Sequence, residues 1–200
     1  NGDYDVEIDH SNIREIKLLS TSFEKMIINL REHKELQHRL SHRDSLTGLR
    51  NTTSYKSWMI EFDTKIQSGN TSFGIAVFDI NNLKEINDTH GHMYGNELIL
   101  TASRIICDTF KRSPVFRIGG DEFCVILQGR DLEDNEALIE SFNSMCLATH
   151  VDKDNVKFSV RIAKGFSEFE PGKDTQFSDV FERADSEMYK NKRDMKIANN

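Results

Sequence analysis

The sequence predicts an α+β domain with a ferredoxin-like βαββαβ centre, preceded by an amphipathic helix with a coiled-coil-like stripe. Two observations predict this fold. Residues 73–192 read as strand, helix, hairpin, helix, strand and helix, with turn signals between them. Residues 12–41 contain neither glycine nor proline, and their apolar positions recur at alternating spacings of three and four. We therefore expect two parts, a helical segment at 1–41 and a mixed domain at 42–200.

The N-terminal helix carries a regular apolar seam. The seam comprises Ile16, Leu19, Phe23, Met26 and Leu30, and it is interrupted at His33 and Gln37 before Leu40. This spacing is typical of a coiled coil, so the helix is expected to pair with a second copy of the chain. The alternative is a single amphipathic helix docked on its own domain. It stays open because the regular pattern covers only about two heptads.

The start of the chain resembles the end of a HAMP linker and its second helix. The resemblance rests on Gly2–Ile8 (GDYDVEI), on Ile13 and on Glu15–Met26 (EIKLLSTSFEKM). HAMP modules relay signals from a transmembrane helix to an output domain, so the resemblance implies a membrane sensor upstream. The chain begins at Asn1 rather than Met and has no apolar run of about 18 residues. We therefore expect a fragment whose membrane attachment, if present, lies in an absent upstream segment.

The mixed domain follows a turn-rich break at Ser41–Asn51. The patterns then predict a helix over 55–66, a strand over 73–80, a helix containing 96–110, strands over 115–118 and 123–127, a helix over 132–146, a long strand over 156–166 and a last helix over 177–192. The strands over 115–118 and 123–127 are joined by a turn that contains Gly119 and Gly120. Glycine is expected there because it tolerates the positive φ that tight hairpins need.

Composition limits the partners. Hydrophobic residues make up 37% of the chain, charged residues 30%, and the net charge is −7. A protein that binds a nucleic-acid backbone usually has a basic face, so polymeric DNA or RNA is not an expected partner. A single nucleotide remains possible, because a metal and a few lysines can hold its phosphates. The three cysteines have no CxxC spacing, which indicates reduced thiols and a cytoplasmic location.

The most informative residues are carboxylates near the hairpin. Arg117–Phe123 reads RIGGDEF, which places Asp121 and Glu122 at or beside the turn, while Asp79 ends the apolar strand GIAVFDI. If these strands are neighbours, Asp79 and Asp121 converge at one edge of the sheet. Two carboxylates together with substrate phosphates suit Mg²⁺. A lone acid in a turn is more often a solvated surface group, so the expectation depends on the pair.

Four motifs in a fixed order resemble the GGDEF diguanylate cyclase family. They are DSLTGLRN at Asp44–Asn51, DINNLKEINDTHGHMYGN at Asp79–Asn96, GGDEF at Gly119–Phe123 and ADSEMYKNKRDMK at Ala184–Lys196. The resemblance implies a nucleotidyl cyclase-like fold that condenses two GTP into cyclic di-GMP and pyrophosphate, as the output domain of a signalling receptor. Because the product needs two nucleotides facing each other, it also implies a homodimer.

The resemblance further implies a metal site and a base. Asp79, the backbone carbonyl of Ile80 and Asp121 would hold one or two Mg²⁺ (or Mn²⁺) ions against the triphosphate. Asp121, or Glu122 beside it, would help deprotonate the ribose 3′-hydroxyl that attacks the second GTP.

The family pattern also implies phosphate and nucleotide contacts. Three lysines would neutralise phosphate charge: Lys84, Lys192 and Lys196. Three polar side chains would border the nucleotide: Asn87, His92 and Asn96. A zinc site at His90 and His92 is not expected, because no third nitrogen or sulfur ligand lies nearby in sequence.

Two departures from the family pattern leave alternatives open. The family usually has Asp where this chain has Asn96, and a carboxylate pairs better with the N1–H and N2–H donors of guanine. Relaxed selectivity with a mixed GMP–AMP product is therefore one alternative, and a non-catalytic GTP-binding module is another. The positions of the family's RxxD product-binding motif read Phe110–Ser113 (FKRS), so product inhibition through that site is not expected. An unrelated nucleotide-binding enzyme is disfavoured, because neither GxxxxGK[ST] nor a strand-linked GxGxxG occurs.

Overall fold

The structure is a computed structural model that describes residues 10–69, 71–154 and 156–197, with side chains of the first helix described for 16–31 and from Ser41 onward. It consists of two units, 1–41 and 42–200. Helix α1 (His10–His42) forms the first unit. The five leading seam residues are each 59–64% exposed. The HAMP-like stretch Gly2–Ile8 and the side chains at the seam's interruption lie outside the described residues.

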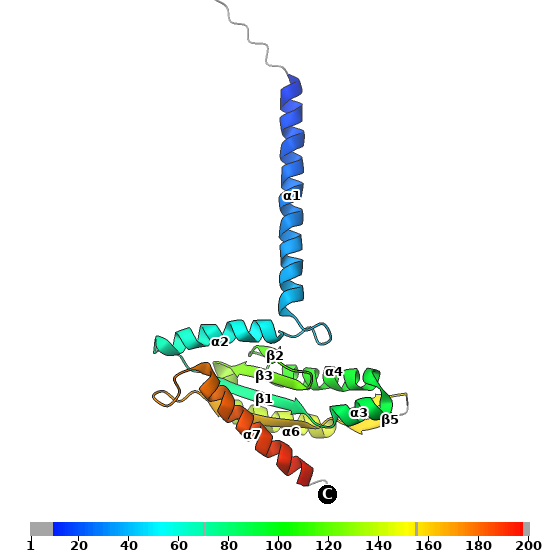
Figure 1. Ribbon diagram of the computed structural model, residues 1–200, viewed down its shortest axis with the longest axis vertical. Helices are drawn as coiled ribbons and strands as arrows, with labels where there is room; N and C mark the ends of the chain where they lie inside the picture. Colours follow the sequence, from blue (N-terminus) through cyan, green and yellow to red (C-terminus); the bar gives the residue numbers. More distant parts are fainter. Residues whose placement is uncertain (1–9, 70, 155, 198–200) are drawn as a thin grey trace, which may run out of the picture. The chain divides into compact units, whose positions relative to one another are not determined.

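The second unit is built on a four-stranded antiparallel sheet with the order β2-β3-β1-β6 (Figure 1). The strands are β1 (Gly74–Ile80), β2 (Val115–Arg117), β3 (Glu122–Leu127) and β6 (Ile162–Glu168). Every residue of β1 is buried, because this apolar strand is covered on both faces. The order, with the first strand central between β3 and β6, confirms the predicted ferredoxin-like centre.

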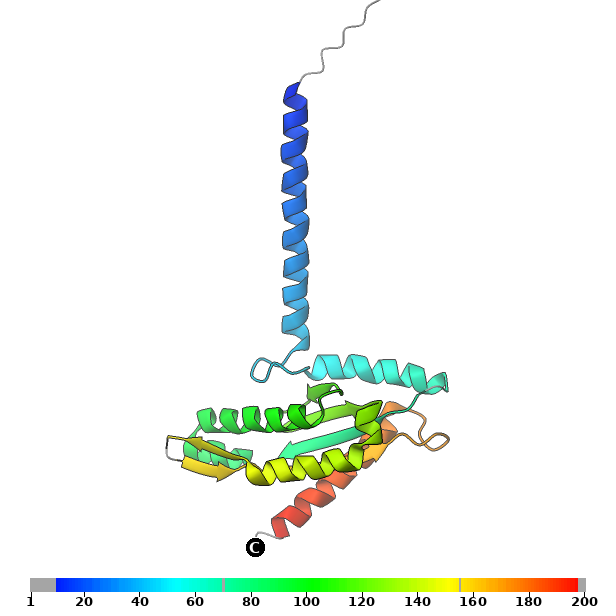
Figure 2. The ribbon, with the colours of Figure 1, turned by 180° about the vertical axis from the view of Figure 1, so that it is seen from behind.

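Six helices of the second unit are described. They are α2 (Thr52–Gln67), α3 (Leu83–His90), α4 (His92–Thr109), α5 (Arg130–Glu133), α6 (Asn135–Ala148) and α7 (Phe177–Ile197). Successive side chains of β1 point to opposite faces of the sheet, so the strand contributes to two hydrophobic cores. Phe78 faces the core formed with α4 and α6, and Val77 faces the core formed with α2 and α7. Figure 2 shows α4 and α6 in front of the sheet, and Figure 1 shows α7 crossing the opposite face.

Two predicted elements were wrong in extent, and one helix was not predicted. The long strand over 156–166 is two strands, because β5 (Val156–Ser159) pairs with β4 (His150–Lys153) in a separate hairpin. The same two-residue alternation runs through β5 and β6, so the sequence pattern does not show the break between them. The helix over 132–146 is interrupted at Asp134, and the short helix α3 was missed. Within the described residues, no helix is long and apolar enough to span a membrane.

Candidate active site

The ends of β1 and β3 bring the predicted acidic residues together. The two strands are antiparallel neighbours, with Asp79 opposite Glu122. Beyond the last paired position, the backbone N–H of Ile80 donates a hydrogen bond to the carbonyl of Asp121 at 3.0 Å. The end of the central strand and the hairpin that carries Asp121 therefore lie at the same edge of the sheet.

The hairpin turn is held by its own backbone. The N–H groups of Ile118 and Gly119 both donate to the carbonyl of Glu122, at 2.9 and 3.3 Å. The expected reason for the two glycines was wrong, since neither has a positive φ. Gly119 instead leaves room for a neighbouring side chain, because a Cβ atom there would lie 2.5 Å from Oε2 of Glu122 and that carboxylate would have to shift.

The acidic cluster is only partly neutralised. Asp79 is 6% exposed, and Nζ of Lys192 lies 2.6 Å from its Oδ1. Burial raises the pKa of Asp79; Lys192 opposes this effect, repulsion from Asp121 adds to it, and the net shift is upward. Burial likewise raises the pKa of Glu122, with further repulsion from Asp121 and Asp79. The cluster therefore favours a positively charged occupant beyond the one lysine.

The donor set fits a hard divalent cation that takes part of its coordination from substrate. Within the described residues, no three His, Cys, Asp or Glu side chains are grouped so that they alone could hold a metal. Carboxylates at Asp79 and Asp121 and the Ile80 carbonyl supply oxygen ligands only. Mg²⁺ is commonly bound in this way, through one or two carboxylates together with phosphate oxygens and water.

Cations surround this cluster unevenly. Lys192 and Lys196 both project from α7, and both act on Asp79 so as to lower its pKa, with Lys192 the stronger. Lys84 lies exposed in the first turn of α3, directly after the connection from β1. That connection contains Asn82 at φ 62°, a left-handed conformation that asparagine tolerates better than most residues. The structure therefore brings two of the three lysines near Asp79, whereas Lys84 lies exposed on α3.

The residues expected to border the nucleotide lie on a neighbouring helix pair. Asn87 is half-buried on α3, while His92 and Asn96 are exposed at the start of α4. Gly95 faces Asn87 so closely that a Cβ atom would lie 2.0 Å from Oδ1 of Asn87. The close packing of α3 against α4 thus fixes where the Asn87 amide can sit.

Arg117 is a site residue that the sequence reading overlooked. Its Nη1 donates to Oδ1 of Asp44 at 2.9 Å, and its Nη2 donates to the carbonyl of Gly120 at 2.7 Å. Asp44 also accepts from the backbone N–H and hydroxyl of Thr47, at 2.8 and 2.7 Å. Arg117 therefore connects the DSLTGLRN turn to the GGDEF hairpin. Asp44 stands within a motif already singled out, but sequence spacing gave no sign of its partner.

Asp185 is a second overlooked residue. It lies exposed on α7, and its charge contributes to the raised pKa of Glu122. It thereby adds negative charge to the same cluster from a helix that also supplies the lysines. The sequence offered a signal, because Asp185 falls within the ADSEMYKNKRDMK motif.

Comparison with known proteins shows which family the domain resembles. Residues 41–197 match the family described as "Diguanylate cyclase, GGDEF domain". The chain is 31% identical over 170 residues to a probable diguanylate cyclase, DgcC, of Escherichia coli. The aligned region covers 82% of this chain and 44% of that protein. It is also 31% identical over 150 residues to the diguanylate cyclase DgcS of Shewanella oneidensis, covering 74% and 49%.

A solved structure shows the same fold. The coiled coil and GGDEF domain of DgcB from Caulobacter crescentus, crystallised with c-di-GMP, superimposes with a TM-score of 0.76 at 26% identity, covering 90% of this chain and 94% of that one. The chain spans less than half the length of the curated relatives DgcC and DgcS. Diguanylate cyclases with this domain generally depend on a divalent metal. The family match, the ordered motifs and the acidic edge of the sheet agree, and the chain belongs to the GGDEF diguanylate cyclase family.

Proposed function

We propose that this chain condenses two molecules of GTP into cyclic di-GMP, releasing two pyrophosphates. The observation that carries this proposal is that Asp79, Asp121 and Glu122 lie at one edge of the sheet. Lys192 forms an ion pair with Asp79, the buried residue of the three. The relatives named as diguanylate cyclases favour this activity over a mixed GMP–AMP product and over a non-catalytic module. The three unpaired cysteines suit a cytoplasmic location, where GTP is available.

The residues would act by positioning and by neutralising charge. Asp79, Asp121 and the Ile80 carbonyl would hold Mg²⁺ or Mn²⁺, which would supply charge stabilisation on the phosphates. Asp121 or Glu122 accepts the proton of the 3′-hydroxyl as that oxygen forms a bond to the α-phosphorus of the opposing GTP. The bond from the α-phosphorus to the bridging oxygen breaks, and pyrophosphate leaves. Lys84, Lys192 and Lys196 balance the charge on the departing group.

A second chain would supply the second nucleotide. One domain offers one acidic edge, and two ester bonds must form between two GTP molecules, so two copies must face each other. The seam on α1 gives the means, because its apolar side chains are exposed and spaced for helix pairing. Replacing Leu19 and Phe23 together by Gln is expected to make activity fall on dilution at concentrations where the parent chain stays active. Equal activity at every dilution would argue against this pairing.

The direct test is product identity. The chain is incubated with Mg²⁺ and GTP, ATP or both, and products are identified by mass spectrometry. Cyclic di-GMP alone is expected, with Asn87 and Asn96 reading guanine; a hybrid product would instead show that Asn96 relaxes the selectivity.

The role of the hairpin acid is tested by substitution. Asp121→Ala is expected to abolish pyrophosphate release, whereas Glu136→Ala, an exposed acid on α6, should leave it unchanged. Activity that survives Asp121→Ala would contradict the proposed mechanism.

A further inference from the structure

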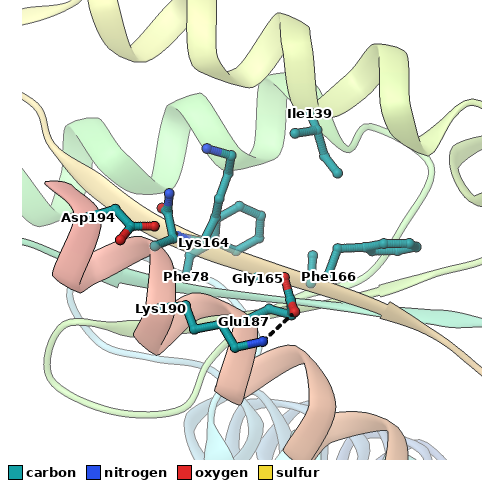
Figure 3. Close-up of a pocket in the computed structure, with 10 residues that line it drawn as sticks. Phe78, Ile139, Lys164, Gly165, Phe166, Glu187, Lys190 and Asp194 are labelled. Atoms are coloured by element: carbon teal, nitrogen blue, oxygen red, sulfur yellow. Dashed lines mark hydrogen bonds and ion pairs between the residues drawn. The ribbon is translucent and has the colours of Figure 1, made fainter.

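A cavity of about 420 Å³ lies at the outer edge of the sheet and is lined by residues of α6, β6 and α7 and by residues 159–161, which lead from β5 into β6. Its volume falls within the range of about 300–1,000 Å³ that is usual for small-molecule pockets. A second cavity of about 480 Å³, drawn in Figure 3, shares Lys164 and Asn191 with it. Neither cavity is lined by the acids of the candidate active site, so this edge is a separate location.

The charged groups of the 420 Å³ cavity all have one sign. Its lining contains Lys164 and Arg161, and no Asp or Glu among the described residues. The whole chain has 33 acidic residues against 26 lysines and arginines, so composition alone would not favour a lining with only cations. Arg161 is exposed, and no described carboxylate forms an ion pair with it.

Lys164 is the less solvated of the two cations. It is half-buried, burial lowers its pKa, and no described carboxylate pairs with it. Its Nζ lies 6.0 Å from the ring centroid of Phe142. The neighbouring thiol of Cys146 does not balance the charge, because burial raises the pKa of that thiol to about 11 and keeps it protonated.

Two acids of α7, Glu187 and Asp194, line the adjoining cavity, and among the described residues neither forms an ion pair with Lys164. Oε1 of Glu187 accepts from Nζ of Lys190 at 3.1 Å. Figure 3 shows the Lys164 side chain directed away from this ion pair. A partly desolvated ammonium without a counter-charge costs free energy, and a bound anion would recover it.

The remainder of the lining suits a ligand that is polar at one end and apolar at the other. Asn191 is held in place because its Oδ1 accepts from the backbone N–H of Lys164 at 3.1 Å. Asn143 adds a second amide from α6. The other side chains are largely apolar and include Phe142, Leu147, Val160, Ile162 and Met195.

We propose that this cavity binds a small organic anion, a carboxylate or a monophosphate attached to an apolar body. Lys164 and Arg161 bind the anionic group, and the apolar body packs against Phe142. The site lies on β6 and on the residues that lead into it, and β6 pairs with β1. The backbone carbonyl of Arg161 accepts a hydrogen bond from the backbone N–H of Asn81 at 2.9 Å.

Titration calorimetry of the 200-residue chain tests the proposal, with phenyl phosphate and benzoate as probes and benzyl alcohol as the neutral control. At least one anion is expected to bind while the alcohol does not, and the anion that binds identifies the headgroup. Lys164→Met, which keeps most of the side-chain length without the charge, should raise the Kd at least tenfold. Lys157→Met, an exposed lysine of β5 outside the lining, should leave the Kd unchanged.

Two further variants locate the binding and guard against misfolding. Arg161→Gln, at an exposed position, should raise the Kd about threefold with an unchanged melting temperature. Lys192→Met should retain binding, because Lys192 belongs to the acidic edge. The proposal is overturned if neither anion binds, if benzyl alcohol binds equally well, if Lys164→Met and Arg161→Gln both leave the Kd unchanged, or if Lys192→Met abolishes binding.

Discussion

Replacing Gly95 by Ala should impair nucleotide recognition without unfolding the domain. Gly95 lies inside α4 without a positive φ, so its backbone can accept alanine. The new Cβ atom would lie 2.0 Å from Oδ1 of Asn87, whereas an ordinary contact begins at 3.4 Å. The Asn87 amide must therefore move by about 1.4 Å or rotate away.

The structure sets the expected size of this effect. A displacement of about 1 Å in a positioning group can lower kcat/KM roughly 100-fold, which corresponds to about 2.7 kcal/mol. Alanine is favoured over glycine inside a helix by about 1 kcal/mol, which offsets part of the local crowding. The midpoint of urea unfolding should therefore stay close to that of the parent chain while activity falls.

The assay compares GTP with inosine triphosphate, which lacks the exocyclic amine of guanine. If Asn87 reads that edge of the base, the parent chain prefers GTP, and Gly95→Ala loses most of this preference. In an Asn87→Ala background, Gly95→Ala should add little, because no amide remains to be displaced. An equal loss of kcat/KM in both backgrounds would refute the reasoning, and so would an unchanged preference for GTP.

Three further predictions follow from single contacts. Arg117→Lys should lower kcat/KM at least tenfold and the free energy of unfolding by about 1.5–3 kcal/mol. The reason is that lysine cannot bond both Asp44 and the Gly120 carbonyl as the guanidinium does. Parent-like values in pyrophosphate-release and urea-unfolding assays would contradict this. Burial acts to raise the pKa of Asp174, but hydrogen bonds from Arg183 and a backbone N–H outweigh it and leave the pKa low. The stability that Asp174 contributes is therefore present above its unfolded pKa of about 3.9 and lost as pH falls through the lower folded value. Arg183→Met should reduce that acid dependence in urea titrations below about pH 4, and an unaltered slope would count against it. Gly165→Ala should destabilise the domain by about 3 kcal/mol, since its Cβ atom would lie 2.0 Å from a backbone carbonyl of α7; Gly120→Ala, with open space around it, is the neutral control.

The sequence determined the fold class and the location of the acidic edge. Buried strands have short apolar runs, and hairpins have turn residues, so β1, β2 and β3 could be read locally. Because antiparallel neighbours end at a shared edge, the position of Asp79 at the end of one strand and of Asp121 beside the next implied that they would meet. The family motifs added expected roles for these residues.

Only the tertiary structure decided contacts that join distant segments. The pairing of Arg117 with Asp44 spans 73 positions, and no local period encodes such a partner. The roles of Gly119 and Gly95 could not be predicted from the sequence either. Neither glycine has a positive φ, and each instead leaves room for a neighbouring side chain. The break between β5 and β6 was missed for a related reason, because both strands share one two-residue alternation. That period determines which face of a strand is buried, but the strand with which it pairs depends on the tertiary structure.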